Sequence, residues 1–199
     1  MITESDKKYV ESLFPALTEI QDPNLREKVI GIWAEAWKDG NYEKIEDIGW
    51  FEPWRHKYTW PNVSHTNQVT ECAMAMAKVA QEVMGMEVNM DYLVAAAILH
   101  DVDKAVLFDG KTKEPTAWLQ KLPHATYSVY LVLKAGLPLD IAHMVLTHTA
   151  FSLKRQKTVE ALILHMADYL IADLRNFKEG VDFLWSAEVP RYTELPDVK

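Results

Sequence analysis

Cysteine is almost absent from this chain of 199 residues, and glycine and proline are scarce. The single cysteine, Cys72, excludes a disulfide framework within the chain and a zinc site built from several cysteines. Seven glycines and nine prolines are too few for a low-complexity chain or for an all-β protein rich in tight turns. A lone thiol fits a reducing compartment, so we expect a cytoplasmic protein.

Long hydrophobic runs are also absent. No stretch approaches the roughly 18 consecutive apolar residues of a transmembrane helix, so the sequence predicts no contact with a membrane. The opening residues, MITESDKKYVESLF, mix both charges and do not fit a signal peptide. The length is that of one domain, and we expect residues 1–199 to form a single one.

The charge balance argues against a nucleic-acid partner. The chain has 21 basic and 29 acidic residues, a net charge of −8. A protein that neutralises many phosphates normally carries a basic stripe, and here the one local basic cluster is Lys154, Arg155 and Lys157. The sequence therefore favours chemistry on a small molecule over binding of a nucleic acid polymer.

Apolar periodicity predicts an almost entirely helical chain, with Ser5, Ser64 and Thr158 as N-caps. In the helix capped by Ser64, the stripe from His65 and Val69 through Val79 and Val83 is expected to face the core. Residues 50–62 are expected to form a structured aromatic loop, and residues 105–122 an exposed insertion. The expected helices are residues 5–20, 23–38, 43–48, 65–84, 89–101, 124–135, 138–147 and 158–175.

Histidine and aspartate stand where core-facing residues belong. His100 and Asp101 end the apolar run LVAAAIL, and Asp168 lies in the middle of an apolar helix. A buried carboxylate is costly unless it is paired or bound to a metal ion. Carboxylates among imidazoles are best explained by metal, and we expect the set His65, His100, Asp101, His124, His148 and Asp168 to bind it.

The remaining histidines are interpreted differently. His56 and His143 are expected to be structural, because neither has a partner that the sequence identifies. His165 precedes Asp168 by three residues and shares its helix face, so it could support the site without binding metal.

The ordered series of these residues resembles the HD-domain metal-dependent phosphohydrolase superfamily. The strings AILHDVDK, LPHATYSVYLVLKAGLPLDIAHMVLTHT and HMADYLIADL carry the resemblance, which covers residues 60–176. It implies an all-α HD-domain helical bundle. Residues 1–59 would be an N-terminal helical extension, residues 60–176 the metal-binding core, and residues 177–199 a C-terminal tail.

The resemblance also implies a chemistry, the hydrolysis of a small-molecule or nucleotide phosphoester by metal-activated water. Two divalent transition-metal ions (iron, manganese, cobalt, nickel or zinc) would be shared through a bridging Asp101, because four imidazoles favour such ions over magnesium. Asp101 and Lys104 would be catalytic. Lys104, Arg155 and Arg55 would bind the anionic substrate, and Trp60 would line the pocket.

The sequence departs from the family pattern at two places. Asp103 replaces the commoner glycine of the His-Asp-x-Gly-Lys string. After His148 the residues TAFSLKRQK lack the Gly-Tyr-Pro signature of the cyclic-dinucleotide phosphodiesterase branch, which disfavours that activity.

Two other functions stay open at this point. The same six ligands occur in mixed-valent diiron oxygenases with this type of domain, and a third reading is a metal-stabilised binding domain without turnover. A homodimer is a further expectation.

Overall fold

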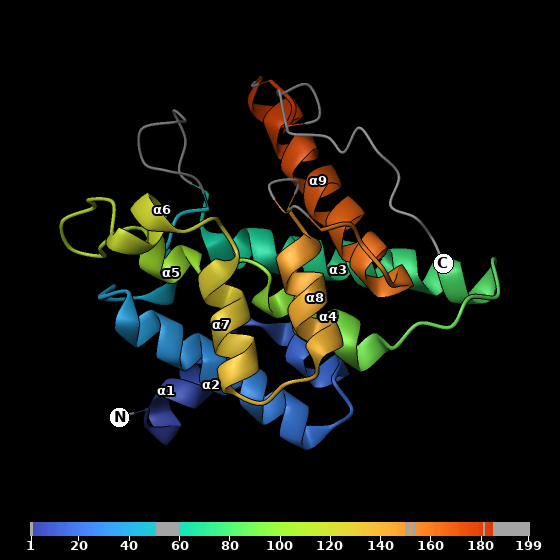
Figure 1. Ribbon diagram of the computed structural model, residues 1–199, viewed down its shortest axis with the longest axis horizontal. Helices are drawn as coiled ribbons and strands as arrows, with labels where there is room; N and C mark the ends of the chain where they lie inside the picture. Colours follow the sequence, from blue (N-terminus) through green and yellow to red (C-terminus); the bar gives the residue numbers. More distant parts are fainter. Residues whose placement is uncertain (1, 51–59, 150–151, 153, 181, 185–199) are drawn as a thin grey trace.

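The computed structural model describes residues 2–50, 60–149, 152, 154–180 and 182–184. Within them the chain is helical (Figure 1), and the only β pairings are the isolated bridges Gly49–Pro61 and Phe108–Pro115. The predicted all-α class is confirmed. Arg55 and His56 lie outside the described residues. The helices are α1 (Glu4–Leu13), α2 (Pro23–Asp39), α3 (Asn62–Glu82), α4 (Met90–Leu99), α5 (Lys104–Leu107), α6 (Ala117–Lys121), α7 (Thr126–Lys134), α8 (Leu139–Thr147) and α9 (Val159–Glu179), with 3-10 turns at Pro15–Glu19 and Ile45–Asp47.

The bounds of α2 follow from its end residues, as predicted. Pro23 occupies the first turn, and the Asp22 carboxylate accepts hydrogen bonds from the backbone N–H groups that follow it. The helix ends at Gly40, where an added Cβ would lie 1.7 Å from the carbonyl oxygen of Ala105. Gly40 therefore lets α2 and α5 approach closely.

The starts of α1 and α3 differ from the prediction. Thr3, not Ser5, caps α1 in a capping box with Asp6, and α1 ends at Leu13 because Pro15 begins a separate 3-10 turn. The helix α3 begins at Asn62, so Ser64 lies within its first turn instead of capping it.

The buried face of α3 matches the predicted stripe only near its start. His65 and Val69 are buried, but Val79 and Val83 are 53% and 77% exposed. The helix instead buries Ala73, Ala77 and Ala80 where it packs against α4 and α9. Apolar side chains occupy both sides of this helix, so periodicity alone did not identify the side that its neighbours cover.

The predicted exposed insertion at 105–122 is wrong at its start. Ala105, Val106, Leu107 and Phe108 are buried, because α5 packs against α2 and α6. Exposed residues follow from Lys111 onward.

The helix α4 lies at the centre of the molecule. Every residue from 93 to 99 is buried, since α2, α3, α8 and α9 all pack around it. The indole N–H of Trp33 donates to the carbonyl oxygen of Ile98 at 2.8 Å, which anchors the last turn of α4. This helix consequently delivers His100 and Asp101 into the interior.

The helices α7 and α8 form the predicted antiparallel hairpin (Figure 1). Gly136 adopts a φ of +66° at the joint, a conformation that favours glycine, and Pro138 precedes α8. The hairpin brings His124, ahead of α7, near His148 at the end of α8. Thr158 caps α9 as predicted, and this helix packs along α3.

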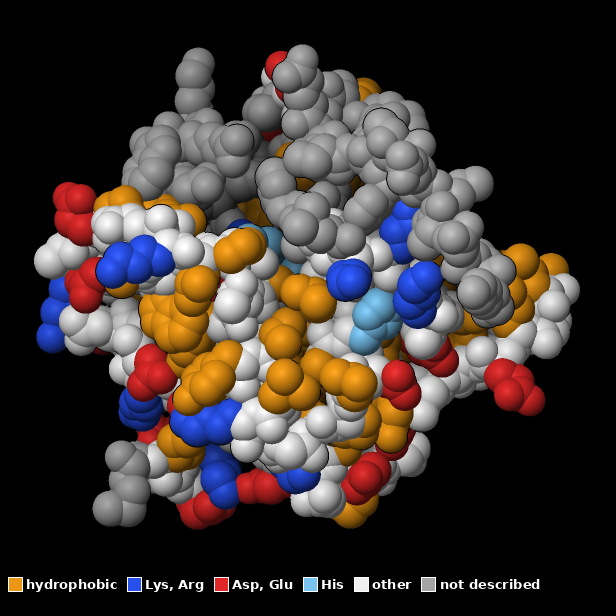
Figure 2. Space-filling model, viewed as in Figure 1, with side chains coloured by type: hydrophobic (Ala, Val, Ile, Leu, Met, Phe, Trp, Pro, Cys, Tyr) orange, Lys and Arg blue, Asp and Glu red, His pale blue; other side chains and the backbone are white. Residues whose placement is uncertain are grey.

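The surface seen in Figure 2 carries hydrophobic side chains over α7 and α8, with Lys and Arg in small groups between them. Exposed apolar residues of these helices include Tyr130, Leu133 and Leu139. Within the described residues, no helix has the length and apolar character needed to cross a bilayer.

Candidate metal centre

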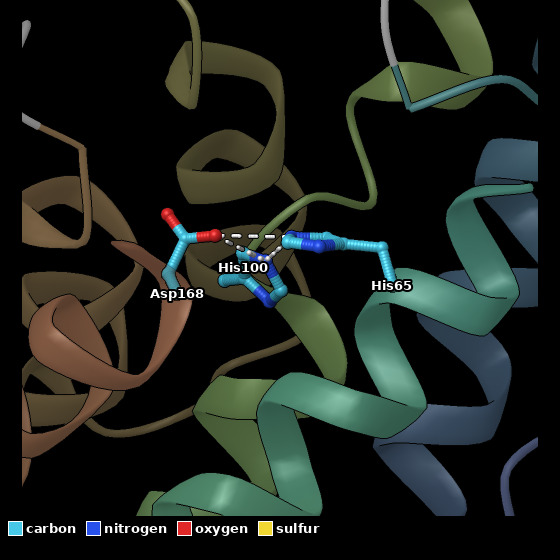
Figure 3. Close-up of side chains that lie close together, drawn as sticks. All are labelled: His65, His100 and Asp168. Atoms are coloured by element: carbon cyan, nitrogen blue, oxygen red, sulfur yellow. Dashed lines mark hydrogen bonds and ion pairs between the residues drawn. The ribbon is translucent and has the colours of Figure 1, made fainter. Parts of the chain in front are cut away.

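His65, His100 and Asp168, called here the first group, come from α3, the end of α4 and α9 (Figure 3). The Nε2 atoms of the two histidines lie 3.2 Å apart. Oδ1 of Asp168 lies 3.0 Å from Nε2 of His65 and 3.8 Å from Nε2 of His100. All three residues are buried, and their ligand atoms lie within 4.8 Å of one another inside the protein.

Asp101, His124 and His148 form a second group. The Nε2 atoms of His124 and His148 are 3.1 Å apart. Oδ1 of Asp101 lies 3.0 Å from Nε2 of His124 and 3.5 Å from Nε2 of His148. The structure therefore brings all six sequence-predicted residues into two adjacent sets.

Asp101 connects the two groups. While its Oδ1 faces the second group, its Oδ2 lies 3.6 Å from Nε2 of both His65 and His100. One carboxylate thus presents a different oxygen to each group, which is the arrangement that a bridging ligand requires.

Hydrogen bonds fix the far sides of two imidazole rings, one in each group. Nδ1 of His100 donates to the carbonyl oxygen of Ala97, and Nδ1 of His148 to that of Val145, each at 2.7 Å. A carbonyl only accepts, so the proton resides on Nδ1 and Nε2 is free to bind a cation.

The imidazole rings of the two groups differ in their protonation. Burial lowers the pKa of His100 to about 4, so this ring is neutral at neutral pH. Burial also lowers the pKa of His124, but Asp103 and Asp101 outweigh it and raise that pKa to about 9. Without metal this ring therefore keeps a proton, which a metal ion bound at Nε2 would displace.

Asp101 itself remains ionised. Burial raises its pKa, but the positive charge of Lys104 and the neighbouring rings of His100, His124 and His148 hold it well below the usual range.

The donor set fits transition-metal ions. Two ligand atoms that each lie about 2.0–2.1 Å from one ion are about 3 Å apart, close to the spacings within both groups. Imidazole and carboxylate donors suit iron, manganese, cobalt, nickel or zinc. Each group could hold one divalent ion.

Two supporting residues were missed by sequence reasoning. The side-chain amide of Asn62 donates to the backbone oxygen of Asp101 at 3.0 Å. Asp103, noted above only as a departure from the family pattern, accepts a hydrogen bond from Nδ1 of His124 at 2.9 Å. Its position two residues after Asp101 was a signal, but its partner lies 21 residues away.

Aromatic rings enclose His65. The rings of Trp50 and Trp60 are centred 4.3 Å and 4.9 Å from its imidazole, and both tryptophans are buried. Trp60, predicted to line the substrate pocket, thus packs against a histidine of the first group.

The predicted supporting and structural histidines have backbone partners. Nδ1 of His165 donates to the carbonyl oxygen of His148 at 2.6 Å, so it contacts a residue of the second group through the backbone. Nε2 of His143 accepts from the backbone N–H of Lys157 at 3.0 Å, in line with a structural role.

The predicted substrate-binding residues are separated. Lys104 begins α5 beside Asp101 and is half-buried. Arg155 lies with Lys154 and Lys157 at a cavity of about 400 Å³. The other residues that line this cavity come mostly from α7 and α8, and none of the six predicted ligands is among them. Substrate binding by Arg155 stays a prediction.

Comparisons with known proteins agree with the geometry. Residues 62–173 match the HD domain family. The chain is 32% identical over 169 residues to the dihydroneopterin 2′,3′-cyclic phosphate phosphodiesterase of Methanocaldococcus jannaschii, a match that covers 80% of this chain and 67% of that protein. No solved structure matches the chain. Its helical fold, its two His/Asp groups and these matches establish that the chain belongs to the HD-domain family of metal-dependent phosphohydrolases.

Proposed function

We propose that this protein hydrolyses a phosphoester of a small molecule with two divalent transition-metal ions. The observation that carries the proposal is Asp101, whose two oxygens face the two groups separately. A single-ion site would need only His65, His100, Asp101 and Asp168. Nε2 of His124 and Nε2 of His148 both lie near Oδ1 of Asp101, which supports a second ion.

The first group and Asp101 would hold one ion, and the second group the other. Ions bound there would lower the pKa of water and polarise the phosphoryl oxygens. The ligand carboxylates of Asp101 and Asp168 carry about −2 against about +4 from two divalent ions. The loaded site would therefore be cationic and attract an anion.

The chain's own residues then orient the substrate. Lys104 follows Asp101 by three residues and adds a positive charge, which also contributes to the low pKa of Asp101. We assign to it the binding of a phosphoryl oxygen through a charge-assisted hydrogen bond. Asp101 is the shared residue that keeps the two groups in a fixed relation.

The named relative narrows the choice of substrate to test. That protein acts on a 2′,3′-cyclic phosphate of dihydroneopterin. We therefore propose cyclic phosphodiesters of small heterocyclic molecules as the first substrate class for this chain, ahead of linear phosphomonoesters.

The test is a panel of 2′,3′-cyclic phosphates, linear diesters and monoesters, assayed with protein of measured metal content. We expect ring opening to a phosphomonoester, with Asp101→Ala as the inactive control. Oxygen consumption without phosphoester turnover would instead favour the diiron oxygenase. Two bound ions with neither activity would favour a non-catalytic domain.

A further inference from the structure

Asp103 makes contacts that a glycine at this position could not make. Its side chain is buried, with the residue 1% exposed. Its Oδ2 accepts two hydrogen bonds, from Nδ1 of His124 at 2.9 Å and from the backbone N–H of Ala125 at 2.7 Å. Its own backbone N–H donates to Oγ of Ser128 at 3.0 Å. Three hydrogen bonds therefore join the segment after Asp101 to the start of α7.

His124 needs this support because it does not belong to a helix. His100 and His148 each use the carbonyl three residues earlier in their own helix to fix the ring. His124 instead precedes α7, and the next residue, Ala125, has a φ of +71°. This left-handed conformation is unfavourable for alanine and persists only where its surroundings hold it.

Asp103 is not itself placed as a ligand. It contacts Nδ1 of His124, whereas the ring's Nε2 faces Asp101 and His148 on the opposite side. The Asp103 carboxylate thus lies behind the imidazole, where it fixes the ring and the strained peptide together.

We propose that Asp103 is a positioning residue that selects the Nε2-binding tautomer of His124 and forms the second group before an ion enters it. This inference rests on the proposed two-ion site. It assigns Asp103 to the second group alone, because none of its hydrogen bonds reaches His65, His100 or Asp168 among the described residues.

The test is titration of the metal-free full chain with Co²⁺, by calorimetry and by the visible absorption of the bound ion. We expect wild type to bind two equivalents. Asp103→Ala is expected to keep the first equivalent and to bind the second about 10–100-fold more weakly. Asp103→Asn can accept both hydrogen bonds through its one carbonyl oxygen, and should recover part of the second affinity.

Ser128→Ala is the matched control. It removes the hydrogen bond to the same segment but leaves the carboxylate on His124, so it should bind both equivalents as wild type does. The proposal is overturned if Asp103→Ala binds both equivalents normally, or if Ser128→Ala loses the second equivalent just as selectively.

If Asp103→Ala does not fold, Asp103→Asn provides the test. Weaker binding of the second equivalent alone, relative to wild type, supports the role. Wild-type affinity for both equivalents overturns it. Wild type that binds only one equivalent would refute the two-ion site as well. A selective loss in a protein without phosphoester turnover would leave this inference standing and refute the proposed function.

Discussion

The first group comes from two long helices and the end of a third, whereas the second group includes a residue from a turn ahead of its helix. His65 and Asp168 project from the long helices α3 and α9, and His100 ends the buried helix α4. In the second group, His124 precedes its helix and depends on Asp103. Helix packing positions the first group, whereas specific hydrogen bonds position His124 of the second group. The comparison implies that the second group is the easier of the two to disrupt.

Asp101 contacts both groups, so its replacement should have the largest effect on metal content and activity. Asp101→Ala removes a carboxylate oxygen from each group, and we expect both ions and the activity to be lost, with kcat lower by about 10³-fold. Elemental analysis and phosphodiesterase assays measure this. Wild-type metal content in the variant would contradict the bridging role.

Removal of metal should destabilise the whole core. Ions that bind only the folded chain, at about 100 times their dissociation constant, contribute about 3 kcal/mol each. We expect a chelator to lower the unfolding temperature and Zn²⁺ or Mn²⁺ to restore it. A melting curve that does not respond to either treatment would argue against a buried metal centre.

The close contact between α2 and α5 can be tested at Gly40, because α5 directly follows Asp103 in the chain. Gly40→Ala would place a Cβ against the Ala105 backbone, and we expect a loss of about 1–3 kcal/mol in the free energy of unfolding. Denaturant titration measures it.

The control for that variant lies in the same helix. Gly31 has open space around an added Cβ, so Gly31→Ala should instead stabilise the protein by about 0.5–1 kcal/mol. Equal effects at the two positions would contradict the close approach at Gly40.

Lys104 should matter for substrate but not for either metal group. Lys104→Ala is expected to keep both ions and to weaken phosphoryl binding by about 1–3 kcal/mol, seen mainly in KM. Lys111→Ala, at an exposed position after α5, is the matched control. Unchanged kinetics for Lys104→Ala would show that this charge does not touch the substrate.

Much of the site could be predicted from the sequence. Burying a polar residue in an apolar helix costs free energy unless it has a partner. The apolar sequence around His100, Asp101 and Asp168 therefore indicated that they bind something. Helix ends with strong local signals, such as Pro23 and Thr158, were equally predictable. These features depend on residues within one or two turns of the chain.

What only the tertiary structure decided depends on contacts between distant residues. The side of α3 that is buried depends on where α4 and α9 pack, and apolar residues on both of its faces left that choice open. The role of Asp103 required a turn 21 residues later to present His124 and Ala125 to its carboxylate. Local periodicity and capping act over a few residues, whereas a buried hydrogen bond between segments exists only once the chain has folded around it.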